Sequence, residues 1–308
     1  MVSQSAARPL IVEEAPKLRA GLQRLAGYWA LTKPEVNLLI LVTTFAGFCL
    51  ALPPPIHHFP VLLLINTLLG TLMVASGTGT LNQFIERNFD AQMRRTARRP
   101  IVSGRIAATN ALWFGVALSC FGCVYLAVAV NALASFLALL TLLTYLLVYT
   151  PLKRKTPFCV LVGALPGAMP PLIGWAAAGS RLNLEAWSLY AILFLWQFPH
   201  FMAIAWIYRE DYSRASYLVL PRGEIKSRAM QVQSVLPCLL LLPASLVPFL
   251  PLHSHLAYTI ASVFISLIFL LYALRLSFER SNAVARRLLF ASLIYLPAIF
   301  LALLLSKL

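Results

Sequence analysis

Acidic residues are scarce in this chain: its 308 residues include only ten Asp and Glu, and charged residues of both signs make up 11%. Apolar residues make up 60%, and the mean hydropathy is +0.80. A soluble domain cannot bury that much apolar surface, because its interior is too small. The composition therefore excludes an ordinary soluble enzyme.

The sequence also lacks the alternating, strand-length pattern that a membrane β-barrel requires. Apolar runs of about 20 residues recur instead, which is the length at which a helix spans a bilayer. We therefore predict an all-α, polytopic membrane protein with about nine transmembrane helices. They are expected at residues 34–52, 60–82, 110–128, 132–150, 158–178, 186–206, 230–249, 255–274 and 288–306.

Positive charge is distributed unevenly between the two sides of the predicted helices. Of the 25 Lys and Arg residues, 23 precede the first span or lie in every second loop, and only Arg181 and Lys307 fall on the other side. The positive-inside rule then places the N-terminus in the cytoplasm and the C-terminus across a bacterial inner membrane. The net charge of +15 thus indicates membrane topology and not nucleic-acid binding.

No apolar signal core occurs in the first 27 residues, so we expect them to form a short, mobile cytoplasmic tail before one membrane domain at 28–308. The five cysteines all fall within predicted spans. Cys120 and Cys123 form a CxxC pair, but no His or second Cys pair accompanies it. Packing in the core is therefore expected for them, in preference to redox or metal chemistry.

Two basic loops resemble each other. Asp90 is followed ten residues later by Pro100, and Asp211 ten residues later by Pro221, with a Gly-X-Ile after each proline. This pattern predicts a parallel internal repeat of two four-helix halves plus one extra helix, with a site at their interface.

Oxygen-bearing side chains form a stripe at the end of the second span. Asn82, Glu86 and Asp90 are spaced i, i+4, i+8, which on a helix places them on one face over about 12 Å. Such a stripe suits Mg²⁺, and the arginines that follow suit a diphosphate; these are Arg94, Arg95, Arg98 and Arg99. The alternative is a helix cap with a basic loop on anionic lipid headgroups, which explains the arginines but not the stripe.

A second acidic pair, Glu210 and Asp211, closes the sixth span. Adjacent helical positions diverge by about 100°, and we expect Asp211 to point inward because it matches Asp90 in the repeat. An interfacial tyrosine belt with snorkelling charges is the alternative. If the helix continues past Pro199, His200 lies about 16 Å below Asp211 on the same face. His200 is then a proton acceptor or metalloporphyrin contact, or simply a hydrogen-bonded core histidine.

An ordered set of motifs resembles the UbiA superfamily of intramembrane prenyltransferases, and within it the protoheme IX farnesyltransferases. The stretches are Leu31–Pro34, Asn82–Met93 with Arg95 and Thr96, Tyr149–Arg154 with Thr156-Pro157, Gly163-Ala164 with Pro170–Trp175, Trp196-Gln197 with Pro199–Phe201, and Asp211-Tyr212. The resemblance covers about residues 28–305. Glu86 stands where Asp is common, and Ala215-Ser216 where Ala-Gly is usual. No second acid follows four residues after Asp211, which favours the heme branch.

The resemblance implies that farnesyl diphosphate alkylates a vinyl group of heme b to give heme o and diphosphate. It implies Mg²⁺ as cofactor, and a heme A synthase or terminal oxidase assembly as possible partner. Metal and diphosphate binding is then expected at Asn82, Glu86, Asp90 and Asp211, with His200 on the heme side. Phosphate contacts are expected from Arg94, Arg95, Arg98, Lys153 and Arg154.

Two other functions fit parts of the sequence. The same fold could prenylate an aromatic quinone or chlorophyll precursor, which is also an electron-rich acceptor. A transporter or heme-handling scaffold would share the repeat and the membrane spans. It would not need an acid–arginine cluster at the membrane face.

Overall fold

A computed structural model describes residues 14–53, 58–179, 181–220, 225–247 and 256–307, and within them every regular element is a helix. The helices are α1 (Glu14–Leu31), α2 (Pro34–Ala51), α3 (Val61–Asp90), α4 (Ala108–Ala129), α5 (Ala132–Leu143), the π-helix η2 (Thr144–Tyr149), α6 (Thr150–Leu152), α7 (Cys159–Gly167), α8 (Pro170–Ala177), α9 (Leu184–Ile207), α10 (Arg209–Arg214), α11 (Ile225–Leu246), α12 (Leu256–Glu279) and α13 (Asn282–Lys307). The all-α fold is confirmed.

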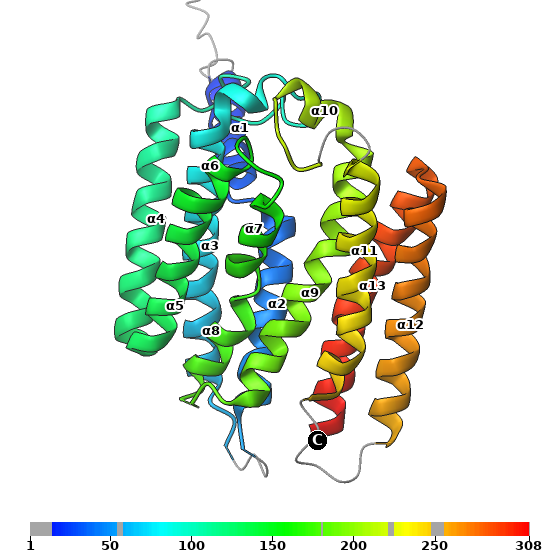
Figure 1. The fold of residues 1–308 in the computed structure, drawn as a ribbon. Helices are drawn as coiled ribbons and strands as arrows, with labels where there is room; N and C mark the ends of the chain where they lie inside the picture. Colours follow the sequence, from blue (N-terminus) through cyan, green and yellow to red (C-terminus); the bar gives the residue numbers. More distant parts are fainter. Residues whose placement is uncertain (1–13, 54–57, 180, 221–224, 248–255, 308) are drawn as a thin grey trace, which may run out of the picture.

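The long helices run side by side in a bundle, with α1 and α10 at one end and the last turn of α13 at the other (Figure 1). They fall into two contacting groups. One contains α2, α3, α4, α5 and α8, and the other contains α9, α11, α12 and α13. Contacts of α2 with α13 and of α8 with α9 join the two groups. The ends of α3 and α10 lie at the same end of the bundle (Figure 1), as the predicted repeat requires.

Within the described residues, eight segments are long and apolar enough to cross a membrane: Pro34–Ala51, Val61–Asp90, Ala108–Ala129, Ala132–Leu152, Cys159–Ala177, Leu184–Ile207, Leu256–Glu279 and Asn282–Lys307. The expected span at 230–249 corresponds to α11, whose apolar part, Met230–Leu246, is shorter than the others. The count of nine spans is therefore not confirmed.

Apolar side chains cover the outside of the bundle, and small polar ones lie inside it. Val128 is 83% exposed and Leu62 72%, whereas Thr67 and Thr80 are fully buried. The interior also holds a large apolar core, so the difference from a soluble protein is the apolar outer surface, which suits a surrounding of lipid tails. Glycines bring the backbones close: a side chain on Gly174 would collide with the backbone of Thr44 in α2.

Several predicted helices differ in detail. The span expected at 132–150 contains the π-helix η2, and the one expected at 158–178 is interrupted between α7 and α8. Proline explains the second break, since Pro170 cannot donate a backbone hydrogen bond. Pro199 lies inside α9 without ending it, but α9 ends at Ile207.

The expected tail contains a helix. Residues 14–31 form α1, while residues 1–13 lie outside the described part, and a mobile tail at 1–27 stays a prediction. Cys159 and Cys238 lie in the core as expected, and Cys123 packs against it, whereas Cys120 is exposed. The core position predicted for Cys120 is therefore wrong, because it lies on the outer face of α4.

Candidate active site

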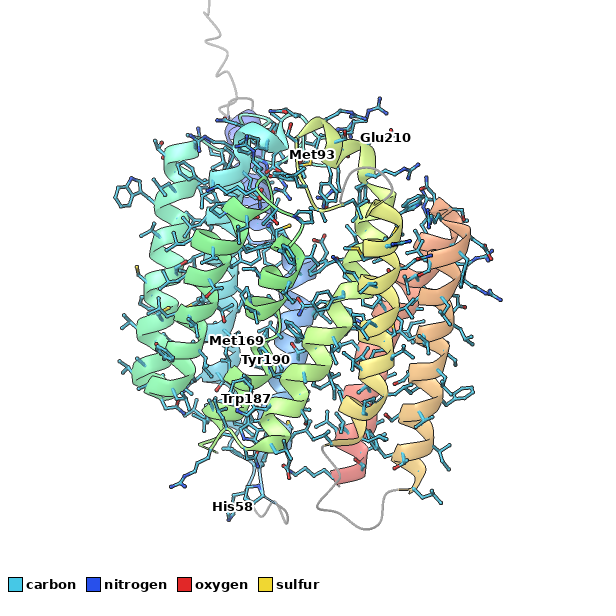
Figure 2. All side chains as sticks on the ribbon, viewed as in Figure 1. His58, Met93, Met169, Trp187, Tyr190 and Glu210 are labelled. Atoms are coloured by element: carbon cyan, nitrogen blue, oxygen red, sulfur yellow. The ribbon has the colours of Figure 1, made fainter. Side chains whose placement is uncertain are left out.

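The stripe at the end of α3 is buried and faces its neighbours in the bundle. Asn82 and Asp90 are 1% exposed and Glu86 is 5% exposed. Their spacing places all three on one helix face, as expected. Figure 2 labels Met93, just beyond this stripe, and Glu210 on α10 at the same end of the bundle.

Each member of the stripe meets a different cation, and each cation comes from another segment. The contacts are Lys33 Nζ to Asn82 Oδ1 at 2.9 Å, Lys153 Nζ to Glu86 Oε1 at 2.7 Å, and Arg99 Nη1 to Asp90 Oδ2 at 2.5 Å. Buried charges of this kind are tolerated only when they are paired. The end of α3 is thus a compact cluster of acceptor oxygens and cations.

Lys33 reaches Asn82 from a strained turn between α1 and α2. Its φ of 55° is left-handed, a conformation that a lysine keeps only where its surroundings enforce it. The turn is held by Asn37, which donates to the Thr32 carbonyl at 2.8 Å, and by Gln83, which donates to the Leu31 carbonyl at 3.0 Å. Burial and the nearby positive charge of Arg99 lower the pKa of Lys33 to about 7. A bound anion would raise that pKa again.

Lys153 is placed by the π-helix η2, a feature often found at functional sites. Its ammonium lies 4.6 Å from the ring centroid of Tyr149 and 6.0 Å from those of Tyr145 and Tyr217. Burial by itself would lower the pKa of Lys153, but Tyr149 and Glu86 raise it well above its usual range. Lys153 therefore stays charged.

Tyr217 completes the aromatic surround from the segment after α10. Its side chain is 7% exposed, and its hydroxyl makes no hydrogen bond of normal geometry with a described residue. The hydroxyl nevertheless lies close to the Glu86 carboxylate, and burial, then the negative charge of Glu86, raise the pKa of Tyr217. The hydroxyl is thus a protonated donor.

Asp211 joins α10 to the loop that follows α3. Its Oδ1 and Oδ2 accept the backbone N–H groups of Arg94 and Arg95, each at 3.2 Å, and Arg214 Nη1 lies 3.2 Å from Oδ1. Asp211 is buried, whereas the side chain of Glu210 is 76% exposed. The inward member of the pair is the expected one, and its carboxylate orients the arginine loop.

The other residues predicted to contact phosphate are not members of this buried cluster. Arg94, Arg95, Arg98 and Arg154 are exposed and form no ion pair with a described carboxylate. Arg95 stacks over the Tyr208 ring at 4.9 Å, and Arg154 over the Phe89 ring at 4.1 Å. Their phosphate-binding role stays a prediction.

His200 lies apart from the acidic cluster, on α9. Its Nδ1 is 2.8 Å from Ser292 Oγ of α13, and its ring stacks on Trp196 with centroids 4.6 Å apart. These contacts fit the reading as a hydrogen-bonded core histidine, and a heme-side role stays a prediction. The shared helix face with Asp211 is wrong, because α9 ends at Ile207 and Asp211 belongs to the separate helix α10.

Sequence reasoning did not assign Lys33 or Tyr217 to the cluster, and it named Arg99 only as one of four arginines that suit a diphosphate, without an individual contact. Lys33 carried a signal, since it sits in the Thr-Lys-Pro motif before the first span. Arg99 lies within the basic loop and was not separable from its neighbours. Nothing in the sequence around Tyr217 indicates that it approaches Lys153.

The donor set fits a hard divalent cation. Asp90 Oδ1 is buried with no hydrogen-bond partner among the described residues, and the amide of Asn82 and the carboxylate of Glu86 lie on the same face of α3. Magnesium takes one or two protein carboxylates and fills its remaining positions with water and phosphate. Among the described residues, no group of three His, Cys, Asp or Glu is arranged around a metal position.

Comparison with known proteins places this geometry in context. Residues 40–296 match the UbiA prenyltransferase family. A protoheme IX farnesyltransferase of Solibacter usitatus is 45% identical over 286 residues, covering 91% of this chain and 98% of the relative. One from Myxococcus xanthus is 42% identical over 284 residues, covering 90% and 93%.

Solved structures share the fold at low identity. A digeranylgeranylglyceryl phosphate synthase has a TM-score of 0.73 at 16% identity, covering 92% of this chain and 98% of its own. A UbiA homolog from Archaeoglobus fulgidus bound to GPP and Mg²⁺ has a TM-score of 0.60 at 17% identity, covering 90% and 99%. The extent of the family match and of the relatives' identity establishes that this chain belongs to the UbiA prenyltransferase family.

Proposed function

We propose that this chain transfers the farnesyl group of farnesyl diphosphate to the vinyl group of heme b, giving heme o and diphosphate. The observation that carries the proposal is the 45% identity to a protoheme IX farnesyltransferase over nearly the whole of both chains. The buried cluster at the end of α3 supports it, because ionising an allylic diphosphate requires its charge to be neutralised.

Asn82, Glu86 and Asp90 would hold Mg²⁺, with Asp211 as a further candidate from α10. The UbiA homolog that carries GPP and Mg²⁺ supports this choice of metal. When bound, Mg²⁺ would neutralise diphosphate charge. The unpartnered Asp90 Oδ1 is the oxygen most available to it.

Lys33, Arg99 and Lys153 supply the nearest positive charges for the diphosphate. Arg94, Arg95, Arg98 and Arg154 are exposed at the same end and would meet the diphosphate as it enters or leaves. Asp211 contributes by holding the backbone of Arg94 and Arg95. Charge-assisted contacts of this kind are the strong ones in phosphate sites.

In the reaction, the C1–O bond of farnesyl diphosphate breaks and diphosphate leaves with the electron pair. The vinyl π electrons of heme b form the new C–C bond to C1. Water then adds to the resulting cation and loses a proton to solvent, which leaves the hydroxyethylfarnesyl group. The apolar surround of the bundle would keep water from the allylic cation until the C–C bond has formed, and His200 would lie on the heme side.

We further place the protein in the inner membrane of a bacterium, with α1 on the cytoplasmic side. Most of its Lys and Arg residues precede the first span or lie in loops at that end, which favours this orientation. Its hydrophobic product would stay in the bilayer, so a heme A synthase or a terminal oxidase assembly is the partner expected to receive it.

Product analysis tests the function. Purified protein is incubated with heme b, farnesyl diphosphate and Mg²⁺. The hemes are then separated, and their molecular masses are measured by mass spectrometry. A heme that has gained one farnesyl group and one hydroxyl group is expected. If heme b is unchanged while an aromatic quinone precursor is prenylated, the acceptor is a quinone precursor. If no acceptor is prenylated, a transporter or scaffold is favoured.

A further inference from the structure

The acidic cluster contains two buried polar atoms that no described residue satisfies, and they are of opposite kind. Asp90 Oδ1 is an acceptor without a donor, and the Tyr217 hydroxyl, although close to the Glu86 carboxylate, makes no hydrogen bond of normal geometry with a described residue. Native proteins leave few such atoms, and a missing ligand is one of the usual reasons. An anion bound together with a metal ion would satisfy both atoms. The metal ion would bind Asp90 Oδ1, and an oxygen of the anion would accept the hydrogen bond of the Tyr217 hydroxyl.

The position of Tyr217 is fixed by its backbone on both sides. Its N–H donates to the Tyr212 carbonyl at 2.8 Å, and the next N–H, of Leu218, donates to the Lys153 carbonyl at 2.8 Å. Ser216 before it has a φ of 55°, a left-handed conformation that serine seldom adopts. The backbone is therefore strained at the residue that precedes Tyr217, and this conformation places the Tyr217 ring next to Lys153.

Two other tyrosines of the bundle have partners for their hydroxyls. The Tyr295 hydroxyl lies 3.1 Å from Ser266 Oγ, and the Tyr125 hydroxyl donates to Asn66 Oδ1 at 2.9 Å. Tyr217 differs from them because its hydroxyl is buried beside the predicted metal–diphosphate site. Packing of its ring against Met93 and Ala215 would be served equally well by phenylalanine.

We propose that the Tyr217 hydroxyl donates a hydrogen bond to the diphosphate of the substrate, on the side of the site where Lys153 pairs with Glu86. This inference rests on the proposed function and adds a binding residue to it. The hydrogen bond from Tyr217 to the diphosphate oxygen would become stronger as negative charge develops on the leaving diphosphate.

The test is Tyr217→Phe in the full-length protein, with Tyr295→Phe as the matched control. Binding of inorganic diphosphate with Mg²⁺ is measured by calorimetry, together with the thermal unfolding midpoint. For Tyr217→Phe we expect diphosphate affinity to fall roughly ten- to hundredfold, as for loss of a hydrogen bond to a charged group. The unfolding midpoint should stay the same or rise, because an unsatisfied buried hydroxyl has been removed.

The control should behave in the opposite way. Tyr295→Phe removes a satisfied hydroxyl far from the site, so its unfolding midpoint should fall while diphosphate affinity stays unchanged. In steady-state assays, Tyr217→Phe should raise KM for farnesyl diphosphate and leave KM for heme b unaltered.

Wild-type diphosphate affinity in Tyr217→Phe would overturn the inference, as would a lowered unfolding midpoint with unchanged affinity, since that marks a structural hydroxyl. Wild-type protein that does not bind diphosphate with Mg²⁺ would instead contradict the proposed function itself. The two failures are therefore distinguishable.

Discussion

The Asp211 carboxylate accepts a hydrogen bond from the backbone N–H of Arg94, at 3.2 Å and across 117 residues of sequence. A side chain of α10 thereby fixes the start of the loop that follows α3. Asp211 thus holds the loop next to the Asn82, Glu86 and Asp90 stripe through backbone hydrogen bonds. This role does not depend on whether Asp211 also binds a metal.

Replacing Asp211 should loosen this loop. Asp211→Ala leaves the N–H groups of Arg94 and Arg95 without acceptors and should cost about 1–3 kcal/mol in the free energy of unfolding. Hydrogen exchange at these two amides should become faster, and Asp211→Asn, which keeps one acceptor oxygen, should show a smaller change. Glu210→Ala is the control, since that side chain is 76% exposed. Unchanged exchange in Asp211→Ala would show that the loop is held by other contacts.

Asp90 should be needed for turnover. Asp90→Asn keeps the shape but removes the charge that pairs with Arg99 and that would bind Mg²⁺. We expect the rate of heme product formation to fall by about a hundredfold or more, as when a preorganised electrostatic contact is lost. The Mg²⁺ concentration for half-maximal activity should rise. Glu185→Gln, at the start of α9 away from this site, is the control; near-normal rates in Asp90→Asn would refute the metal assignment.

Lys153 and Glu86 should be coupled energetically. Their side chains are only 12% and 7% exposed, so Lys153→Met or Glu86→Gln alone leaves a buried charge unpaired, at a cost of about 3–5 kcal/mol. The double variant should lose much less than the sum, and unfolding of the four proteins in detergent gives the coupling. Simple additivity of the two losses would mean that the pair does not interact.

Gly163 should control the position of Tyr149, and through it Lys153. A Cβ at Gly163 would lie 2.5 Å from Tyr149 Cε2, so Gly163→Ala must push the ring aside. We expect a loss of about 1–3 kcal/mol in stability and a several-fold loss of activity.

Gly21→Ala provides the matched comparison for this change. A Cβ there has no neighbour within 4 Å, and alanine is the better helix former by up to about 1 kcal/mol. That variant should be fully active and at least as stable as the wild type. If Gly163→Ala matched it in both measurements, the Tyr149 ring would have no fixed role beside Lys153.

The sequence by itself determined the features that depend on local physics. Long apolar runs must become helices in a bilayer, because backbone groups there have to pair within their own segment. The stripe of Asn82, Glu86 and Asp90 follows directly from helical periodicity, and all three are buried as a functional stripe requires. The burial of Asp211 and not Glu210 also followed, from the match to Asp90 in the repeat.

Only the tertiary structure decided what surrounds that stripe. Lys33 meets Asn82 across 49 residues and Lys153 meets Glu86 across 67, and such pairings depend on how helices pack and not on any local pattern. The break between α9 and α10 likewise overturned a shared face for His200 and Asp211 that simple helix geometry predicts. Tyr217 enters the site through a left-handed turn at Ser216, a strained conformation that surrounding contacts stabilise and that the sequence does not encode locally.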